Sequence, residues 1–180
     1  MNMNDKGKKG FTLIELLVVI AIIALLMAIL MPSLRAAKQQ AASANCMANC
    51  RSLSMAWIMY AEENDSVIVP ANMGPDAWIG QPQAEDGTRY TPTQTSPMVT
   101  DEDEFRGIRE GLLYRYVKDV GVYHCPADNM RISKYDGTRV FGSYALANCL
   151  NGEPASFKHQ IKKLHQITSA SRRYNFVETA

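Results

Sequence analysis

An apolar run of 21 residues near the N-terminus constrains this chain more than any other feature. It covers residues 11–31 and is interrupted by one charged side chain, Glu15. At about 1.5 Å per residue, a helix of this length measures roughly 31 Å, close to the ~30 Å of bilayer hydrocarbon. The run is preceded by Lys6, Lys8 and Lys9, and basic flanks favour the cytoplasmic side. The sequence therefore predicts a transmembrane helix, with the following residues across the membrane.

Two ordinary interpretations leave part of this run unexplained. A secretory signal peptide has a shorter apolar core followed by a small-residue cleavage site, and neither feature is found here. A plain membrane anchor fits the length but does not account for Glu15. A carboxylate placed mid-helix costs about 2.5–3.5 kcal/mol on insertion scales, and intramembrane acids usually have a partner. Glu15 therefore predicts a specific interaction.

The residues at the start of the run resemble a known processing signal. The segment Gly10-Phe11-Thr12-Leu13-Ile14-Glu15, after a short basic leader, is similar to the class III signal of type IV pilins and type II secretion pseudopilins. The resemblance covers residues 6 to about 32. It implies cleavage between Gly10 and Phe11 by a prepilin peptidase on the cytoplasmic face, followed by N-methylation of Phe11. It also implies that Glu15 neutralises the N-terminal amine of a neighbouring subunit during filament assembly.

The rest of the chain is long enough for one small domain. About 150 of the 180 residues remain after the leader and the membrane run. Removal of residues 1–10 changes the formal net charge from +1 to −1. Because nonspecific nucleic-acid binding needs a basic surface, this balance gives no support for a nucleic-acid partner.

A second helical segment follows the membrane run. Residues 33–62 are rich in good helix formers and contain no Gly or Pro, although Pro32 precedes them. Apolar side chains spaced by three and four residues draw one stripe along this segment. We expect a continuous helix from about 11 to 62, roughly 78 Å long, with its second half packed on the domain. The stripe consists of Cys46, Cys50, Leu53, Trp57 and Tyr60.

The four cysteines lie on the predicted extracytoplasmic side, where oxidation is favoured. They are Cys46, Cys50, Cys125 and Cys149, and they allow three pairings, among which the sequence does not choose. Cys46 and Cys50 share a helical face but lie too far apart along a regular helix for an easy disulfide with each other. Each is expected to meet a cysteine from elsewhere. A zinc site is not favoured, because no histidine lies near this pair in the sequence.

Residues 70–104 predict a long surface loop, because five prolines and three glycines punctuate them. Short strands are expected around Trp78 and Tyr90. The acidic cluster 101–104 is interpreted as the first turn of a helix, where acids favour the helix dipole. The alternative is a calcium site at Asp101 and Asp103, although their spacing matches no known calcium loop. No other cofactor is expected.

The remaining residues predict short elements around the helix. Residues 104–118 are expected to be helical, 121–128 to be extended and then turn, and 140–146 and 172–178 to be strands. The predicted fold class is α+β and pilin-like, a long N-terminal helix packed on a small antiparallel sheet with long loops. Its parts are a cytoplasmic leader (1–10), the transmembrane half of the helix (11–31) and an extracytoplasmic domain (32–180).

The soluble part carries a fainter resemblance to a pseudopilin-like group common in planctomycete-type bacteria. The similar residues are Cys46-x-x-Asn49-x-Arg51-x-Leu53, Gly111 to Val117, Tyr123-His124-Cys125-Pro126 and Ser143-Tyr144. Such proteins continue past a strand like 173–178, so we expect the sequence to be a piece of a longer chain. The resemblance makes Cys125 the natural partner of Cys46. Two alternatives remain for the other two cysteines: Cys50 is paired with Cys149, or both are thiols.

The sequence predicts a structural protein and no enzyme. The histidines His124, His159 and His165 lack a catalytic neighbour at any motif spacing, and no phosphate-binding glycine loop is found. We expect a filament subunit in the bacterial inner membrane with its domain in the periplasm. Its expected partners are prepilin peptidase, other pilin-like subunits, membrane lipid, and an assembly platform with its ATPase. The alternative is a tip subunit that binds a ligand, surface or secreted substrate through the 70–104 loop, with Trp78, Tyr90 and the acidic cluster 101–104 as contacts.

Overall fold

The computed structural model describes residues 11–90, 99–128, 142–147, 149–152, 160–168 and 174–178. Their contacts divide the chain into two units, one up to Ala41 and one from Ala42 onward. The long helix α1, Leu13–Glu63, contributes residues to both units. This helix confirms the predicted one to within two residues at either end.

The described part of the first unit consists mainly of the start of α1, which is apolar up to Met31 apart from Glu15. Every residue described from Phe11 to Ala41 is exposed, and the helix continues through Pro32. Its most apolar 18-residue window has a mean hydropathy of 3.2, and none of that window is buried. The helix is therefore long and apolar enough to cross a membrane, which agrees with the predicted α+β, pilin-like fold.

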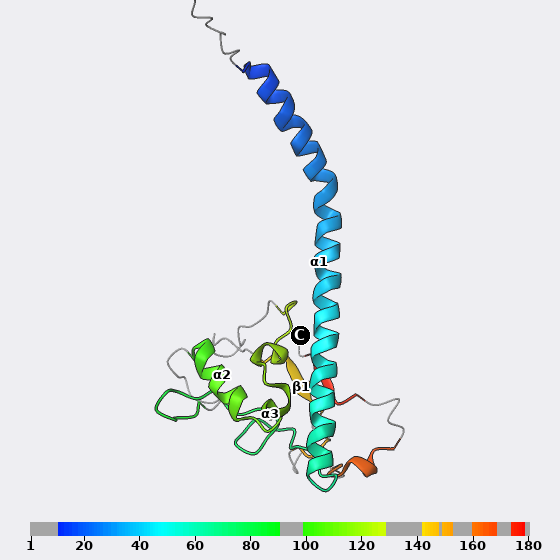
Figure 1. Cartoon of the computed structure of the whole chain (residues 1–180), viewed down its shortest axis with the longest axis vertical. Coiled ribbons are helices and arrows are strands. Elements are labelled where there is room, and N and C mark those ends of the chain that lie inside the picture. Colours follow the sequence, from blue (N-terminus) through cyan, green and yellow to red (C-terminus); the bar gives the residue numbers. More distant parts are fainter. Residues whose placement is uncertain are drawn as a thin grey trace, which may run out of the picture. The chain divides into compact units, whose positions relative to one another are not determined.

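The second unit is built against one face of the later part of α1. The buried side chains of this part follow each other at helical spacing, and Leu53 is fully buried. Figure 1 shows α2, α3 and β1 gathered beside this part of the helix. The predicted apolar stripe is confirmed as core, with Cys50 and Tyr60 partly buried against it. The buried residues of α1 are Cys46, Leu53, Ala56, Trp57 and Ala61.

Two helices follow the 70–90 segment. The helix α2, Asp101–Glu110, begins at the acidic cluster, which confirms the interpretation of that cluster as a first helical turn. The short helix α3 spans Tyr114–Val117, and Leu113 before it is fully buried. The extended segment predicted from residue 121 is wrong in part, because Val120–Tyr123 form the 3-10 helix η1, whose N-cap is the side chain of Asp119.

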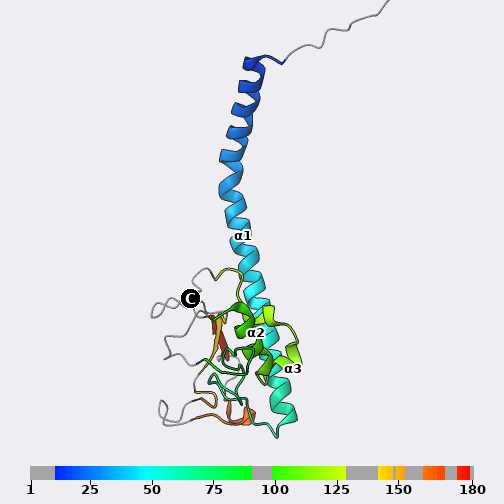
Figure 2. The ribbon, with the colours of Figure 1, turned by 90° about the vertical axis from the view of Figure 1, so that its left-hand side faces the viewer.

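The sheet of the described residues is small. The strands β1, Tyr144–Leu146, and β2, Phe176–Glu178, pair antiparallel with Ala145 opposite Val177. Figure 2 shows these two strands, yellow and dark red, side by side. Both predicted strands are confirmed at their C-terminal ends, and their first residues, 140–141 and 172–173, lie outside the described part of the chain.

The prediction of a surface loop over residues 70–104 is wrong for residues 77–79. Ala77, Trp78 and Ile79 are buried, and the Trp78 indole N–H donates to the carbonyl of Ala71 at 3.1 Å. The Trp78 ring stacks on Tyr123 and meets Phe176 edge-on, with centroids 6.0 and 5.2 Å apart. The predicted short strands here are single bridges, such as that between residues 73 and 79.

A close backbone contact joins this buried segment to α2. The N–H of Gly80 donates to the carbonyl of Gly107 at 3.1 Å. A Cβ atom added to Gly107 would collide with the backbone carbonyl of Gln81, and one added to Gly80 would collide with the carbonyl of Gly107. The two glycines therefore allow α2 to lie directly on residues 80–82.

Replacement of Gly107 by alanine tests this contact. Alanine favours a helix interior by about 1 kcal/mol over glycine, but overpacking typically costs 1–3 kcal/mol and the backbone at Gln81 cannot move aside alone. Because the added Cβ meets backbone atoms, we expect the overpacking cost to lie at the upper end of this range, so that Gly107→Ala lowers the free energy of unfolding by a net ~1–2 kcal/mol. Urea unfolding of the detergent-solubilised chain, followed by the fluorescence of buried Trp57 and Trp78, measures it. Gly74→Ala is the matched control, because no atom lies within 4 Å of its added Cβ. An unchanged Gly107→Ala midpoint would contradict the contact.

Candidate functional site

The start of α1 forms a capping box that holds the carboxylate of Glu15. The backbone N–H and the hydroxyl of Thr12 both donate to Oε2 of Glu15, at 2.8 and 2.7 Å. In return, the N–H of Glu15 lies 3.4 Å from the Thr12 hydroxyl oxygen, and the Thr12 carbonyl accepts from Leu16 N–H at 3.2 Å. Thr12 is thus the N-cap and Glu15 the third helical residue, the reciprocal arrangement of a capping box.

This arrangement gives Glu15 a local partner that the sequence analysis missed. The signal was readable, because a threonine followed three residues later by a glutamate before an apolar run is the pattern of a capping box. The carboxylate of Glu15 therefore has hydrogen-bond partners within its own chain, because the N–H and the hydroxyl of Thr12 both donate to it. Phe11 lies just before the cap and is exposed, whereas Gly10 lies outside the described residues.

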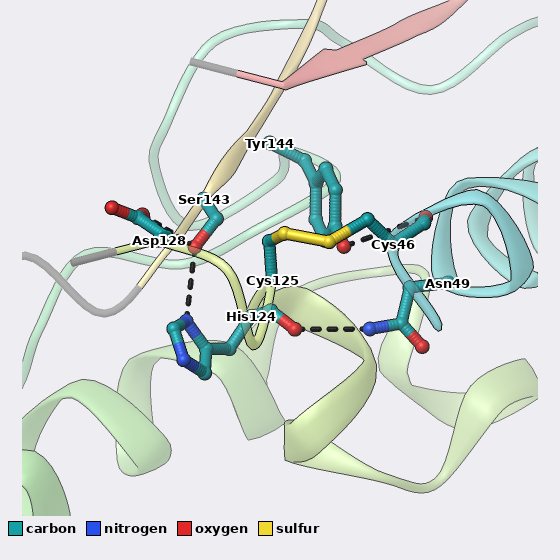
Figure 3. Close-up of a disulfide and its surroundings, with 7 residues drawn as sticks. All are labelled: Cys46, Asn49, His124, Cys125, Asp128, Ser143 and Tyr144. Carbon is teal, nitrogen blue, oxygen red and sulfur yellow. Dashed lines mark hydrogen bonds between the residues drawn. A yellow bond between two sulfur atoms is a disulfide. The ribbon is translucent and has the colours of Figure 1, made fainter. Parts of the chain in front are cut away.

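A disulfide ties α1 to the segment after η1. Cys46 and Cys125 are bonded, with their Cα atoms 5.1 Å apart and both side chains buried. This is the pairing that the resemblance implied. Beside it, the amide of Asn49 donates to the carbonyl of His124 at 2.9 Å, as Figure 3 shows. Cys50 and Cys149 are half-buried thiols, which is one of the two alternatives left open for them.

A polar cluster next to the disulfide brings together residues that lie far apart in the sequence. The hydroxyl of Ser143, which is fully buried, donates to Oδ2 of Asp128 at 2.7 Å. Nδ1 of His124 lies 2.9 Å from the same Ser143 oxygen (Figure 3). Because the serine proton points to Asp128, Nδ1 is the donor in the second bond. Serine is central here, whereas histidine is central in a nucleophilic Ser-His-Asp triad.

The cluster therefore acts as a clamp on the disulfide segment. It connects residues 124 and 128, on either side of Cys125, to the start of β1. His124 belongs to no motif in the sequence, because residues 19 positions apart give no motif spacing. Of the other two histidines, His165 is exposed in η2, Leu164–Gln166, and His159 lies outside the described residues.

Asp103, one of the two residues considered for calcium, is used as a helix cap. Its Oδ2 accepts from the N–H and the hydroxyl of Thr100, at 2.9 and 2.7 Å, and its Oδ1 accepts from Arg106 at 2.6 Å. The backbone hydrogen bond from Thr100 is the main cause that lowers the pKa of Asp103. Asp101 is the first residue of α2. Within the described ranges, no three His, Cys, Asp or Glu side chains form a group suited to a metal ion.

Comparison with known proteins places a family motif on the start of the chain. Residues 5–31 match the model of the prokaryotic N-terminal methylation motif. No curated protein and no solved structure matches the chain. The motif, together with the long apolar helix, is consistent with a type IV pilin or pseudopilin, as the resemblance of residues 6–32 predicted. It supports a pilin-like subunit that prepilin peptidase processes, and it suggests that α1 anchors the chain in a membrane.

The disulfide generates a stability prediction. Cys46 and Cys125 are 79 positions apart, and removing a link of this kind typically costs 2–4 kcal/mol because the unfolded chain gains freedom. We expect Cys46→Ser to lower the free energy of unfolding by about 2–4 kcal/mol in the urea measurement described above. The control is Cys50→Ser, which removes a thiol one helical turn away and leaves the bond intact. Equal stability of Cys46→Ser and the unmodified chain would contradict a structural role for the disulfide.

Proposed function

We propose that this chain is a structural subunit of a type II secretion system or a related type IV pilus-like filament. In this proposal, prepilin peptidase cleaves between Gly10 and Phe11, and the new N-terminus of Phe11 is methylated. The observation that carries the proposal is the methylation motif over residues 5–31, which coincides with the exposed apolar part of α1. A helix that is apolar all round needs an apolar environment on every side.

Two environments can meet that need in succession. The membrane covers the helix first, with the leader lysines on the cytoplasmic side and the domain in the periplasm. Extraction into a filament then replaces lipid by the apolar helices of neighbouring subunits, with the help of an assembly platform and its ATPase. In this proposal the inner membrane is the starting compartment and the cell envelope holds the finished filament.

Glu15 has a separate role in each stage. Before assembly its carboxylate is bound by Thr12 in the same chain. Cleavage after Gly10 creates a positively charged amine on Phe11, and that amine on a neighbouring subunit is the partner that we propose for Glu15. In a low-dielectric surrounding such a pair is favourable only when both charges are present, because an unpaired buried charge is strongly penalised.

A tip subunit that binds a ligand through the 70–104 loop is less well supported. Trp78, one of its expected contacts, is 5% exposed and packs in the core. Residues 101–104 belong to the first turn of α2. Tyr90 is half-buried. We likewise propose no catalytic role, because serine, and not histidine, is the central residue of the cluster at Ser143.

The cleavage step is tested at Gly10. A bulky side chain immediately before the scissile bond should block the peptidase, so Gly10→Val should leave the full-length precursor in the membrane. Gly7→Val is the matched control within the leader, and we expect it to be processed normally. Immunoblots of membranes from cells with an active prepilin peptidase measure the ratio of precursor to shortened chain. Efficient shortening of Gly10→Val would contradict the proposed site.

The role of Glu15 is tested by separating its charge from its capping bond. Glu15→Gln retains a side-chain oxygen for Thr12 but carries no charge, whereas Thr12→Val removes the hydroxyl and leaves the charge. If Glu15 pairs with an amine, Glu15→Gln should be processed yet reduce the subunit in sedimented filaments at least about tenfold, as expected for loss of a charge pair worth over ~1.4 kcal/mol. Thr12→Val should assemble better than Glu15→Gln. The reverse order would show that capping, and not charge, is what assembly requires.

A further inference from the structure

Two basic residues lie just beyond the apolar run of α1, at the end opposite the leader lysines. Arg35 and Lys38 are exposed, and the helix continues through Pro32 to reach them. Because they are three residues apart, their side chains are neighbours on one face of the helix. The cytoplasmic end of a membrane span usually carries the excess of basic residues, so a basic pair at the opposite end needs an explanation.

Neither cation has an acidic partner in its own helix at short range. Residues 16–61 contain no Asp or Glu, so no carboxylate lies three or four positions from Arg35 or Lys38. The ion pairs found among the described residues all involve side chains of α2, and none includes either cation. Within the part of the chain that the structure describes, the pair is therefore available to an anion from outside the chain.

The position of the pair along α1 matches the headgroup layer of a bilayer. When the apolar run fills the hydrocarbon, its last residue, Met31, lies at the boundary. Arg35 and Lys38 then follow about 6 and 10 Å further along the helix. The headgroup layer is roughly 5–7 Å thick on each side, and helical side chains lean toward the N-terminus, here back toward the membrane. Long basic side chains place their apolar stems along apolar surface and keep the charge at the polar boundary.

We propose that Arg35 and Lys38 bind the phosphate group of an anionic phospholipid in the leaflet opposite the leader. The inference rests on the proposed function, which sets the orientation of α1. An anionic headgroup suits two cations that have no carboxylate near them in the helix, and basic residues next to a span are attracted to such lipids. A zwitterionic headgroup brings its own ammonium group, which competes for the phosphate. The contact holds the far end of α1 at a fixed depth and so keeps the bond after Gly10 at the cytoplasmic face.

A tryptophan at Met31 makes this contact measurable. Met31 is exposed and lies within about 40° of both cations around the helix axis. The full chain with Met31→Trp is reconstituted into phosphatidylcholine vesicles that contain either brominated phosphatidylglycerol or brominated phosphatidylcholine. Bromine quenches tryptophan at short range, so the two quenching curves give the relative association of the two lipids at this position. The chain without Met31→Trp gives the signal of Trp57 and Trp78, which is subtracted.

The reporter is insensitive to the leader, because the leader lysines lie near the other leaflet, roughly 30 Å away along the helix. We expect phosphatidylglycerol to be preferred over phosphatidylcholine. Arg35→Gln and Lys38→Gln should each lower the preference about fivefold, the size expected for one basic residue near an anionic surface. Arg51→Gln is the matched control and should keep the preference, because it removes one exposed positive charge about 30 Å beyond Met31.

Equal quenching by the two lipids would overturn the inference and leave the proposed function intact. A preference that survives the combined Arg35→Gln and Lys38→Gln change, or that falls equally in Arg51→Gln, would overturn it as well. Loss of the double variant from sedimented filaments with an unchanged lipid preference would also overturn it, and would indicate a carboxylate of a neighbouring subunit as the partner. No quenching by either lipid would show that α1 stays outside the bilayer, and would refute the proposed function together with the inference.

Discussion

The globular unit depends on a single buried face of α1. Leu53, Trp57 and Ala61 repeat at helical spacing, and the other described elements of the unit are collected around them. The disulfide between Cys46 and Cys125 fixes the start of this face to the segment after η1. With only two short strands in the described residues, a sheet alone would provide little of the core. The helix is therefore the scaffold of the unit, and the loops are held in place by packing against it.

The first part of α1 poses the opposite physical problem, since it is apolar on every side and none of it is buried. A bilayer solves this problem for one chain, and a bundle of identical helices solves it for many. Glu15 caps its own helix through Thr12. Under the proposed function, its carboxylate exchanges that bond for one to an amine once cleavage has produced one. Under the proposed function, processing is thus the chemical event that gives Glu15 a new partner.

Helical features could be predicted from the sequence because their signals are local. The length of the apolar run, the spacing of Leu53 and Trp57, and the acidic first turn of α2 each lie within a few residues. The burial of Trp78 could not be predicted in this way, because the surrounding prolines and glycines are typical of surface loops and its partners, Tyr123 and Phe176, are distant in sequence. The clamp at Ser143 was missed for the same reason. The capping box at Thr12 is different, since its pattern is local and was overlooked.

The most direct test of the central claim is the chemical identity of the N-terminus in the assembled protein. Mass spectrometry of the N-terminal peptide, from chain isolated out of cells with an active prepilin peptidase, measures both cleavage and methylation. The proposed function predicts a peptide that begins at Phe11 and carries one additional methyl group on its amine. A mature chain that still begins at Met1, or that begins at any residue other than Phe11, would contradict it.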